Sequence, residues 1–311
     1  MLHLAEADLG SAFKMSTPKL AIHELHDGGG VPVVLLHPFP FDSRVWAPMA
    51  LALPWGIRAI AVDLPGFGKS DLGSLAPSVD LAADAVYEAL TAYGVGNAIV
   101  VGWSMGGYVA LALAERHPGF VSGLGLVGSK ADADDETTVA NRVRIAREVE
   151  MGQTVQPVMA LLGQILGPTS LARRRALLPT IEAWIRSQHP SGIVWAQRAM
   201  ARRPDRSHVI AAFPGPVAII AGAEDLLSPV HFSQEMHQHA QNGHLTVVPG
   251  ASHLLAIEDP AAVAQAIVDL HAQVVPHGRN AQTSSIPKVR KFSGHPVSRS
   301  IPAVTRRSKT R

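Results

Sequence analysis

A serine, an aspartate and a histidine each follow a short apolar run of the kind that forms a buried strand. Together these three side chains can activate a hydroxyl group. They are Ser104, Asp225 and His253. The runs that precede them are residues 98–101, 216–221 and 245–248. A serine hydroxyl attacks a carbonyl carbon efficiently only when a base takes its proton, and a histidine base works best when a carboxylate orients it. The order serine, aspartate, histidine, each at a strand end, therefore predicts nucleophilic acyl transfer.

The residues around Ser104 indicate a sharp turn between a strand and a helix. Gly102 and Gly106 flank the serine at the spacing G-x-S-x-G, and a helical pattern follows from Tyr108. In this context the serine lies at the apex of a strained turn, and the glycines leave room for the neighbouring strand and helix. The hydroxyl would project beside the N–H groups of a helix N-terminus. A Gly-rich turn of any α/β protein gives the same pattern, so the other two residues decide the interpretation.

Strand-like and helical segments alternate along the chain, which predicts a mostly parallel sheet with helices on both faces. The alternation stops in residues 131–212, where only helical patterns occur, and resumes at residue 216. We therefore expect an α/β core of residues 18–130 and 213–275, with residues 131–212 inserted as a helical cap. Strands are expected at 19–26, 31–36, 57–62, 98–101, 123–127, 216–221 and 245–248.

Both ends of the chain differ in composition from this core. Residues 1–17 have weak patterning and are expected to be a loose leader, with Met15 as an alternative start to Met1. Residues 276–311 hold nine Lys or Arg, no Asp or Glu, and many Pro and Ser, which predicts a disordered basic tail. The rest of the chain has 18 basic and 25 acidic residues, a net charge of −7. The sequence pI near 9.0 thus reflects the tail, and the folded body is not expected to bind nucleic acid.

The overall composition excludes several classes of protein. With 47% hydrophobic and 17% charged residues the chain is of the folded type. It has no run of about eighteen apolar residues, so no membrane span is expected, and no secretory signal is visible. The absence of cysteine excludes disulfides, thiolate nucleophiles and cysteine metal sites. We expect a cytoplasmic location, with a homodimer as one oligomeric state that the sequence leaves open.

The segments together resemble the α/β-hydrolase superfamily. The matching stretches are His37-Pro-Phe-Pro40, Asp63-Leu-Pro-Gly-Phe-Gly-Lys-Ser70, Gly102-Trp-Ser-Met-Gly-Gly107, Gly222-Ala-Glu-Asp225 and Gly250-Ala-Ser-His253. The resemblance is to the capped, cofactor-free, esterase-like branch, which includes enol-lactonases, carboxylesterases and the so-called haloperoxidases or perhydrolases. It covers about residues 19–275 and is specific for fold and triad but not for substrate.

The resemblance also implies a role for each residue. Ser104 would be the nucleophile, His253 the general base and acid, and Asp225 the group that orients His253. The backbone N–H groups of Phe39 and Met105 would form the oxyanion hole. No cofactor and no metal are implied.

Two neighbours of Phe39 bear on that oxyanion hole. Pro38 stands where the family usually has glycine, and proline has no N–H. The expected donor is the next residue, so the hole should persist with an altered loop. His37 is expected to order this loop by hydrogen bonding and to transfer no proton.

Other carboxylates compete with Asp225 for the role of the triad acid. Glu224 lies beside it, and Asp132 and Asp134 follow an earlier strand, where some relatives place the acid. Asp63 also ends a strand. We interpret it as holding the glycine-rich turn that follows it through side-chain to backbone hydrogen bonds.

An apolar pocket is expected beneath the cap. Trp103, Leu162, Leu166 and Trp184 are the candidates for its lining, although core packing gives the same pattern. A metal site is not expected at His231, His237, His239 and His244, because His237 and His239 are two apart on a predicted helix and face different directions. No G-x-x-x-x-G-K-[ST] phosphate loop is present.

The resulting hypothesis is hydrolysis of a carboxylic ester, thioester or lactone of a small to medium, largely apolar substrate through an acyl-enzyme on Ser104. The alternatives are a non-catalytic ligand-binding protein on the same fold and perhydrolase or haloperoxidase-type activity at the same triad. A third places the main role in the basic tail as a tether to nucleic acid or a membrane. The expected partner is a small ester-like molecule, whose acyl and leaving groups the sequence leaves open.

Overall fold

The computed structural model describes residues 18–275. The predicted leader 1–17 and basic tail 276–311 lie outside the described residues. The centre of the described part is a seven-stranded sheet in the order β1-β3-β2-β4-β5-β6-β7. Strand β1 runs antiparallel to β3, and all other neighbouring strands are parallel. The prediction of a mostly parallel sheet is therefore confirmed.

Apolar residues follow one another in the inner strands, which are parallel and covered on both faces, whereas the edge strands β1 and β7 are partly exposed. Seven strands form the sheet. They are β1 (Ile22–His26), β2 (Gly28–Leu36), β3 (Gly56–Val62), β4 (Ala98–Trp103), β5 (Val121–Val127), β6 (Val217–Gly222) and β7 (Gly243–Val248). Every residue of β4 and β6 is buried. Strand β2 begins before the predicted residue 31, because Gly28 and Gly29 pair with the start of β3.

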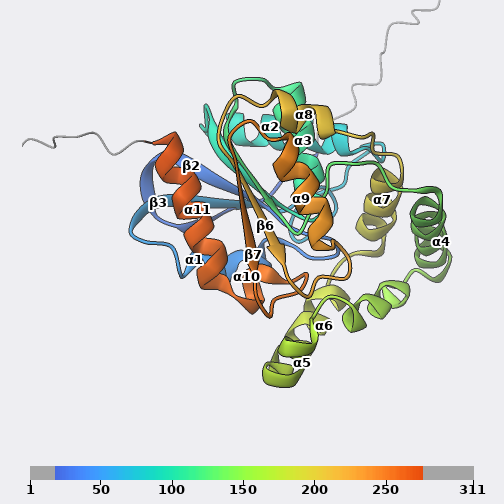
Figure 1. Ribbon diagram of the computed structural model, residues 1–311. Coiled ribbons are helices and arrows are strands. Elements are labelled where there is room, and N and C mark those ends of the chain that lie inside the picture. The colour runs from blue at the N-terminus through green and yellow to red at the C-terminus, as the bar shows by residue number, and fades with distance from the viewer. Residues whose placement is uncertain (1–17, 276–311) are drawn as a thin grey trace, which may run out of the picture. The chain divides into compact units, whose positions relative to one another are not determined.

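Helices cover the two faces of this sheet (Figure 1). Helices α1 (Ala47–Ala50), α10 (Leu255–Glu258) and α11 (Pro260–Val274) pack together on one face. The 3-10 helix η1 (Ser43–Trp46) directly precedes α1. Helices α2 (Val79–Ala92), α3 (Met105–Arg116) and α9 (Val230–His239) lie on the other face. Among residues 18–275, no helix is long and apolar enough to cross a membrane.

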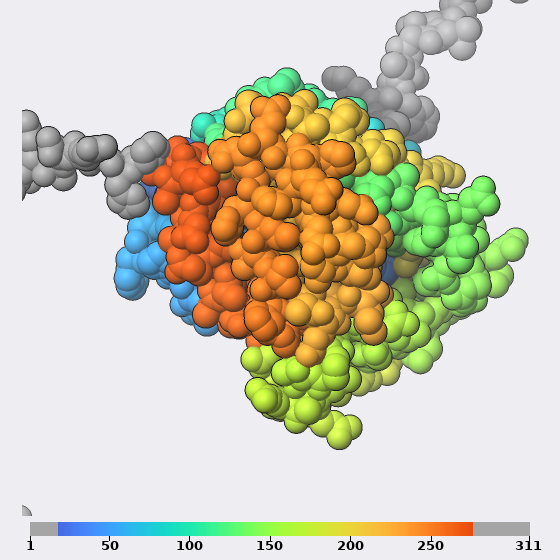
Figure 2. All heavy atoms as spheres, in the orientation of Figure 1, coloured from blue at the N-terminus to red at the C-terminus, as the bar shows by residue number. Residues whose placement is uncertain are grey.

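Between β5 and β6 the chain is helical, as the sequence indicates. This insertion contains α4 (Glu136–Gly152), η2 (Gln156–Gly163), α5 (Pro168–Arg173), η3 (Arg175–Leu177), α6 (Leu178–Arg186), α7 (Pro190–Ala201) and α8 (Ser207–Ala212). Helices α4 and α7 pack against each other, and Figure 2 shows green and yellow-green cap residues projecting beside the core. Helix α8 differs, because it packs against α3 and α9. The predicted cap range 131–212 thus includes one helix that belongs to the core layer.

A buried cluster of charges lies where the cap joins the core. The Asp134 carboxylate forms ion pairs with Arg203 (2.6 Å), Arg142 (2.5 Å) and Lys130 (3.2 Å). Burial alone would raise the pKa of Asp134, but the two arginines hold it far below its usual value. The Arg203 guanidinium also lies 3.9 Å from the centre of the Tyr108 ring on α3. The cluster therefore fastens both ends of the cap to the core.

Helix α3 lies very close to the sheet because glycine occupies the contact. A Cβ atom on Gly106 would lie 2.1 Å from the carbonyl oxygen of Leu36 in β2, and one on Gly102 would lie 2.2 Å from the carbonyl oxygen of Gly106. Both clashes are with backbone atoms, which cannot move without shifting a strand or the helix.

The variant Gly106→Ala should therefore lower the free energy of unfolding by at least about 2 kcal/mol, since overpacking against rigid surroundings has costs of this size. The matched control is Gly96→Ala, because nothing lies within 4 Å of a Cβ built at Gly96. Urea denaturation of both variants measures the difference. Equal stability of the two would contradict the close packing of α3.

Candidate active site

Ser104 lies at the junction of β4 and α3 in a strained backbone conformation, with φ 52° and ψ −112°. Its N–H donates to the carbonyl oxygen of Val127 (2.8 Å), and its own carbonyl oxygen accepts from the N–H of Gly107 (2.8 Å) and the hydroxyl of Ser129 (2.9 Å). The residues on either side of Ser104 are buried, whereas the serine is partly exposed. The surrounding bonds thus hold the hydroxyl at an accessible point of the turn.

His253 and Asp225 form a buried hydrogen-bonded pair, with His253 Nδ1 2.8 Å from Asp225 Oδ2. The other carboxylate oxygen, Oδ1, accepts from the backbone N–H groups of Leu227 (2.8 Å) and Ser228 (2.9 Å). These two bonds fix the carboxylate, which in turn fixes the imidazole with Nδ1 facing Asp225. Nε2 is then the nitrogen left to exchange a proton.

Two residues bring this pair to the serine turn. Gly128, at the end of β5, has φ +49°, and a Cβ there would lie 3.4 Å from Asp225 Oδ2 and 3.6 Å from His253 Nδ1. Trp103 donates its indole N–H to the carbonyl oxygen of His253 (2.8 Å) and packs edge-on against Trp46. Trp103 is fully buried, and lining of the pocket by Trp103 stays a prediction.

Within residues 18–275 the hydroxyl of Ser104 forms no hydrogen bond. The structure therefore joins His253 to Asp225 and links the histidine loop to the serine turn through Trp103, but it does not join His253 to Ser104. In free enzymes the hydrogen bond between a nucleophile and its base often forms well only when substrate is bound.

The two predicted oxyanion donors belong to different elements. Met105 is the first residue of α3, where N–H groups have no acceptor within the helix. Phe39 lies in the loop after β2, which the fully buried His37 orders through a contact of Nδ1 with the carbonyl oxygen of Pro38 (3.0 Å). His37 Nε2 accepts from the N–H of Leu64 (2.9 Å), so the ring proton is on Nδ1. Burial lowers the pKa of His37, which keeps it neutral. The hydrogen bonds predicted for His37 are present, and its role in ordering an oxyanion loop stays a prediction.

The Asp63 carboxylate connects the glycine-rich turn that follows it with the loop that contains Phe39. It accepts from the N–H of Lys69 (2.9 Å), which ends the glycine-rich turn, from the N–H of Ser43 (2.8 Å), and faces His23 Nε2 (2.9 Å). Burial alone would raise the pKa of Asp63, but the hydrogen bonds from Lys69 and Ser43 outweigh it and lower the pKa. The carboxylate thus holds the turn, as predicted, and also holds the loop that contains Phe39.

The competing carboxylates have other partners. Glu224 points to the cap, where it accepts from the N–H (3.0 Å) and the hydroxyl (2.5 Å) of Thr169. Asp134 belongs to the charge cluster at the base of the cap, and the carbonyl oxygen of Asp132 accepts from an arginine of that cluster. Of these carboxylates, only Asp225 contacts the histidine.

Sequence reasoning missed a further buried carboxylate. Glu258, in α10, accepts from the N–H of Ser252 (2.8 Å) and of Gly167 (3.5 Å), and the N–H of Leu254 donates to Ile165 (3.3 Å). Burial raises the pKa of Glu258 despite these bonds. These hydrogen bonds join the cap to the residues on both sides of His253. No sequence motif predicts them.

The predicted pocket residues of the cap lie against the apolar core. Leu166 is buried, and Leu162 and Trp184 are partly buried. Packing accounts for all three contacts, so lining of an acyl pocket by Leu162, Leu166 and Trp184 stays a prediction. In the described part of the chain, no three His, Asp or Glu side chains gather as they would around a metal ion.

Comparison with known proteins identifies the family. The model of the alpha/beta hydrolase family matches residues 33–266. The chain belongs to this family. The hydrolase is 30% identical over 244 residues to the pimeloyl-[acyl-carrier protein] methyl ester esterase of Nitrosomonas europaea. The aligned residues cover 75% of this chain and 92% of that protein.

Solved structures give the same assignment. A thermophilic esterase from Thermogutta terrifontis with bound malate has a TM-score of 0.78 and 29% identity, covering 83% of this chain and 94% of that one. The enol-lactonase from Burkholderia xenovorans LB400 shares the fold, with a TM-score of 0.73 and 22% identity over 82% of this chain and 97% of that one. The predicted class, an ester-hydrolysing enzyme of the α/β-hydrolase fold, is thereby confirmed.

The lowered pKa of Asp63 predicts a pH-dependent contribution to stability. Because the pKa is lower in the folded state, the contribution is complete above the unfolded value of about 4 and is lost as pH falls through the folded value. Asp63→Asn should lower the free energy of unfolding by about 2 kcal/mol at pH 7, and its deficit from wild type should shrink below pH 4. Denaturation between pH 3 and 7 measures this, with the exposed Asp71→Asn as control. A deficit that does not depend on pH would exclude an ionised Asp63 as its origin.

Proposed function

We propose that the hydrolase cleaves a carboxylic ester, thioester or lactone of a small to medium, largely apolar substrate through an acyl-enzyme on Ser104. The observation that supports this best is the buried hydrogen bond between His253 and Asp225 beside a serine in a strained turn. That combination supplies a base of defined tautomer on a loop that Trp103 links to the turn of an accessible hydroxyl.

The reaction begins when Ser104 Oγ attacks the carbonyl carbon and His253 Nε2 takes the hydroxyl proton. The carbonyl oxygen becomes an oxyanion that accepts hydrogen bonds from the N–H groups of Phe39 and Met105. As the tetrahedral intermediate collapses, the bond to the leaving group breaks and His253 returns the proton to it. Water then attacks the acyl-enzyme by the same route, which releases the carboxylic acid and restores Ser104.

The surroundings favour the charges that develop during this reaction. Asp225 is buried, is held by two N–H groups and faces His253 Nδ1, so its carboxylate is placed to stabilise the positive charge that develops on the imidazole. The N-terminus of the twelve-residue helix α3 lies directly after Ser104 and adds a positive potential near the oxyanion. These fixed dipoles need no reorganisation when the negative charge forms.

The pimeloyl-[acyl-carrier protein] relatives suggest a second candidate, an ester whose acyl chain is carried by a protein. A specific observation favours it. The cap has a surface hollow of about 760 Å³, lined by Ala140, Val143, Arg144, Arg147, Glu150 and Arg198. Three arginines and one glutamate make this hollow basic, and within the described residues Arg147 forms no ion pair. An acidic protein surface would complement it.

Replacing the triad residues tests the first candidate. Ser104→Ala should lower kcat for p-nitrophenyl esters by about 10⁶-fold, because it removes the nucleophile. Asp225→Asn should lower it by about 10⁴-fold, because it removes the group that orients the base. The control is Glu224→Gln, which changes the neighbouring carboxylate and should retain most activity. Assays with acyl chains of two to twelve carbons would also show which chain length the pocket accommodates best. Unchanged turnover in Ser104→Ala would refute the proposed nucleophile.

The second candidate makes a different prediction, about charge. Arg147→Glu should raise KM for a methyl ester carried on an acyl-carrier protein by about tenfold at low salt, and less at high salt, because the interaction is electrostatic. Hydrolysis of the same ester free in solution should not change. Arg186→Glu, an exposed change on α6 outside the hollow, is the control. Equal effects on free and carried esters would count against a carrier.

A further inference from the structure

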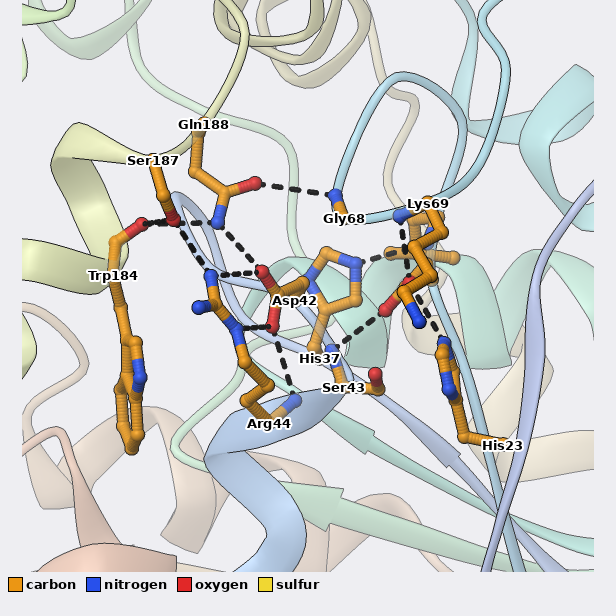
Figure 3. A network of polar contacts seen from close by, with 12 residues as sticks. His23, His37, Asp42, Ser43, Arg44, Gly68, Lys69, Trp184, Ser187 and Gln188 are labelled. Atoms are coloured by element: carbon orange, nitrogen blue, oxygen red, sulfur yellow. Dashed lines mark hydrogen bonds and ion pairs between the residues drawn. The ribbon is translucent and has the colours of Figure 1, made fainter.

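A polar network joins the cap to the loop that contains Phe39 (Figure 3). Asp42, three residues after Phe39, accepts from the N–H of Arg44 (3.1 Å) and binds its guanidinium with both carboxylate oxygens (2.8 and 2.7 Å). The guanidinium of Arg44 also donates a hydrogen bond to the hydroxyl of Ser187 in the cap (2.6 Å). Asp42 also accepts from the side-chain amide of Gln188 (2.8 Å). Two consecutive residues after α6 thus bind the same segment of the core.

Gln188 is the centre of this network, because it contacts both core loops. Its Nε2 donates to Asp42 and to the carbonyl oxygen of Trp184 (3.0 Å), which uses both amide hydrogens. Its Oε1 accepts from the N–H of Gly68 (3.3 Å) in the glycine-rich turn. Gln188 and Asp42 are both buried. The orientation of the amide is therefore determined, because exchanging its O and N atoms would set an oxygen against two acceptors.

The two loops that Gln188 bridges are also packed against each other. The ring of Phe67, in the glycine-rich turn, lies edge-on to the rings of His37 (5.3 Å) and Phe39 (6.2 Å). The N–H of Phe41 donates to the carbonyl oxygen of Pro38 (3.0 Å), which closes the loop around Phe39. A displacement of Asp42 would therefore be transmitted to the backbone of Phe39 through a short, closed segment.

We propose that Gln188 is a positioning residue that, through Asp42, holds the Phe39 N–H in place as an oxyanion donor and so couples the cap to the oxyanion hole. The inference rests on the proposed function of Phe39. It assigns to the cap a role in the chemical step in addition to covering the substrate. An oxyanion donor acts mainly in the transition state, so its displacement should lower kcat more than it changes KM.

The test compares Gln188→Glu with wild type on a p-nitrophenyl ester. The substitution preserves size and the acceptor for Gly68 but sets a carboxylate against Asp42. We expect kcat and kcat/KM to fall by about 10- to 100-fold, with KM within about twofold. The control is Glu182→Gln on α6, which loses only an exposed ion pair and should keep kcat within about twofold.

Two further measurements separate positioning from a purely structural role. An alkyl boronic acid forms a tetrahedral adduct with a serine hydroxyl, so its inhibition constant should rise by the same factor as kcat falls. The carboxylic acid product, which binds without an adduct, should inhibit equally well. If Gln188→Glu does not fold, Gln188→Met removes the two hydrogen bonds that Nε2 donates, and also the acceptor for Gly68, with little change of shape.

The outcomes distinguish this inference from the proposed function. If wild type is not inhibited by the boronic acid and Ser104→Ala retains turnover, the proposed function fails and the role of Gln188 fails with it. If wild type passes both tests but the folded Gln188 variant keeps kcat within twofold, or changes only KM, the positioning role alone is wrong.

Discussion

The close contact between α3 and the sheet is the constraint on which the rest of the structure depends. Leu36 in β2 and Gly106 in α3 approach so closely that no side chain fits between them. Ser104 consequently occupies a conformation that costs free energy, and the bonds to Val127, Gly107 and Ser129 maintain it. Stability of the whole sheet thus supports a strained turn at one point, and that point carries the accessible hydroxyl.

A second constraint is how far apart the contributing residues lie along the chain. The turn at Ser104, the pair Asp225–His253 and the Phe39 loop follow different strands, and all of these strands are parallel in one sheet. Parallel strands bring their carboxyl ends to the same edge, so groups more than 200 residues apart meet there. Trp103 and Gly128 then set the distances between them, one by a hydrogen bond and the other by the absence of a side chain.

Much of this could be predicted because its signals are local. The strand–turn–helix around Ser104 and the residues at strand ends depend on neighbours in the sequence. The contacts of Gln188 with Asp42, 146 residues away, and of Glu258 with Gly167, 91 residues away, have no such signal. The placement of α8 on the core also depends on long-range packing. For Trp103 the sequence left packing and pocket lining open, since a buried indole and a substrate-contacting one have the same apolar neighbours in sequence.

The charge cluster at the base of the cap has a consequence for how far the insertion depends on the sheet. Asp134 and Arg203 bind each other from the two ends of the insertion, so the ends stay together whatever the chain between them does. Helices α4 to α7 are therefore free of the register that the sheet imposes on its own strands. A change of length between the contacts that this span makes with the core would not by itself displace β5 or β6. The fold thus separates a frame whose register the sheet sets from a segment whose length the sheet does not set.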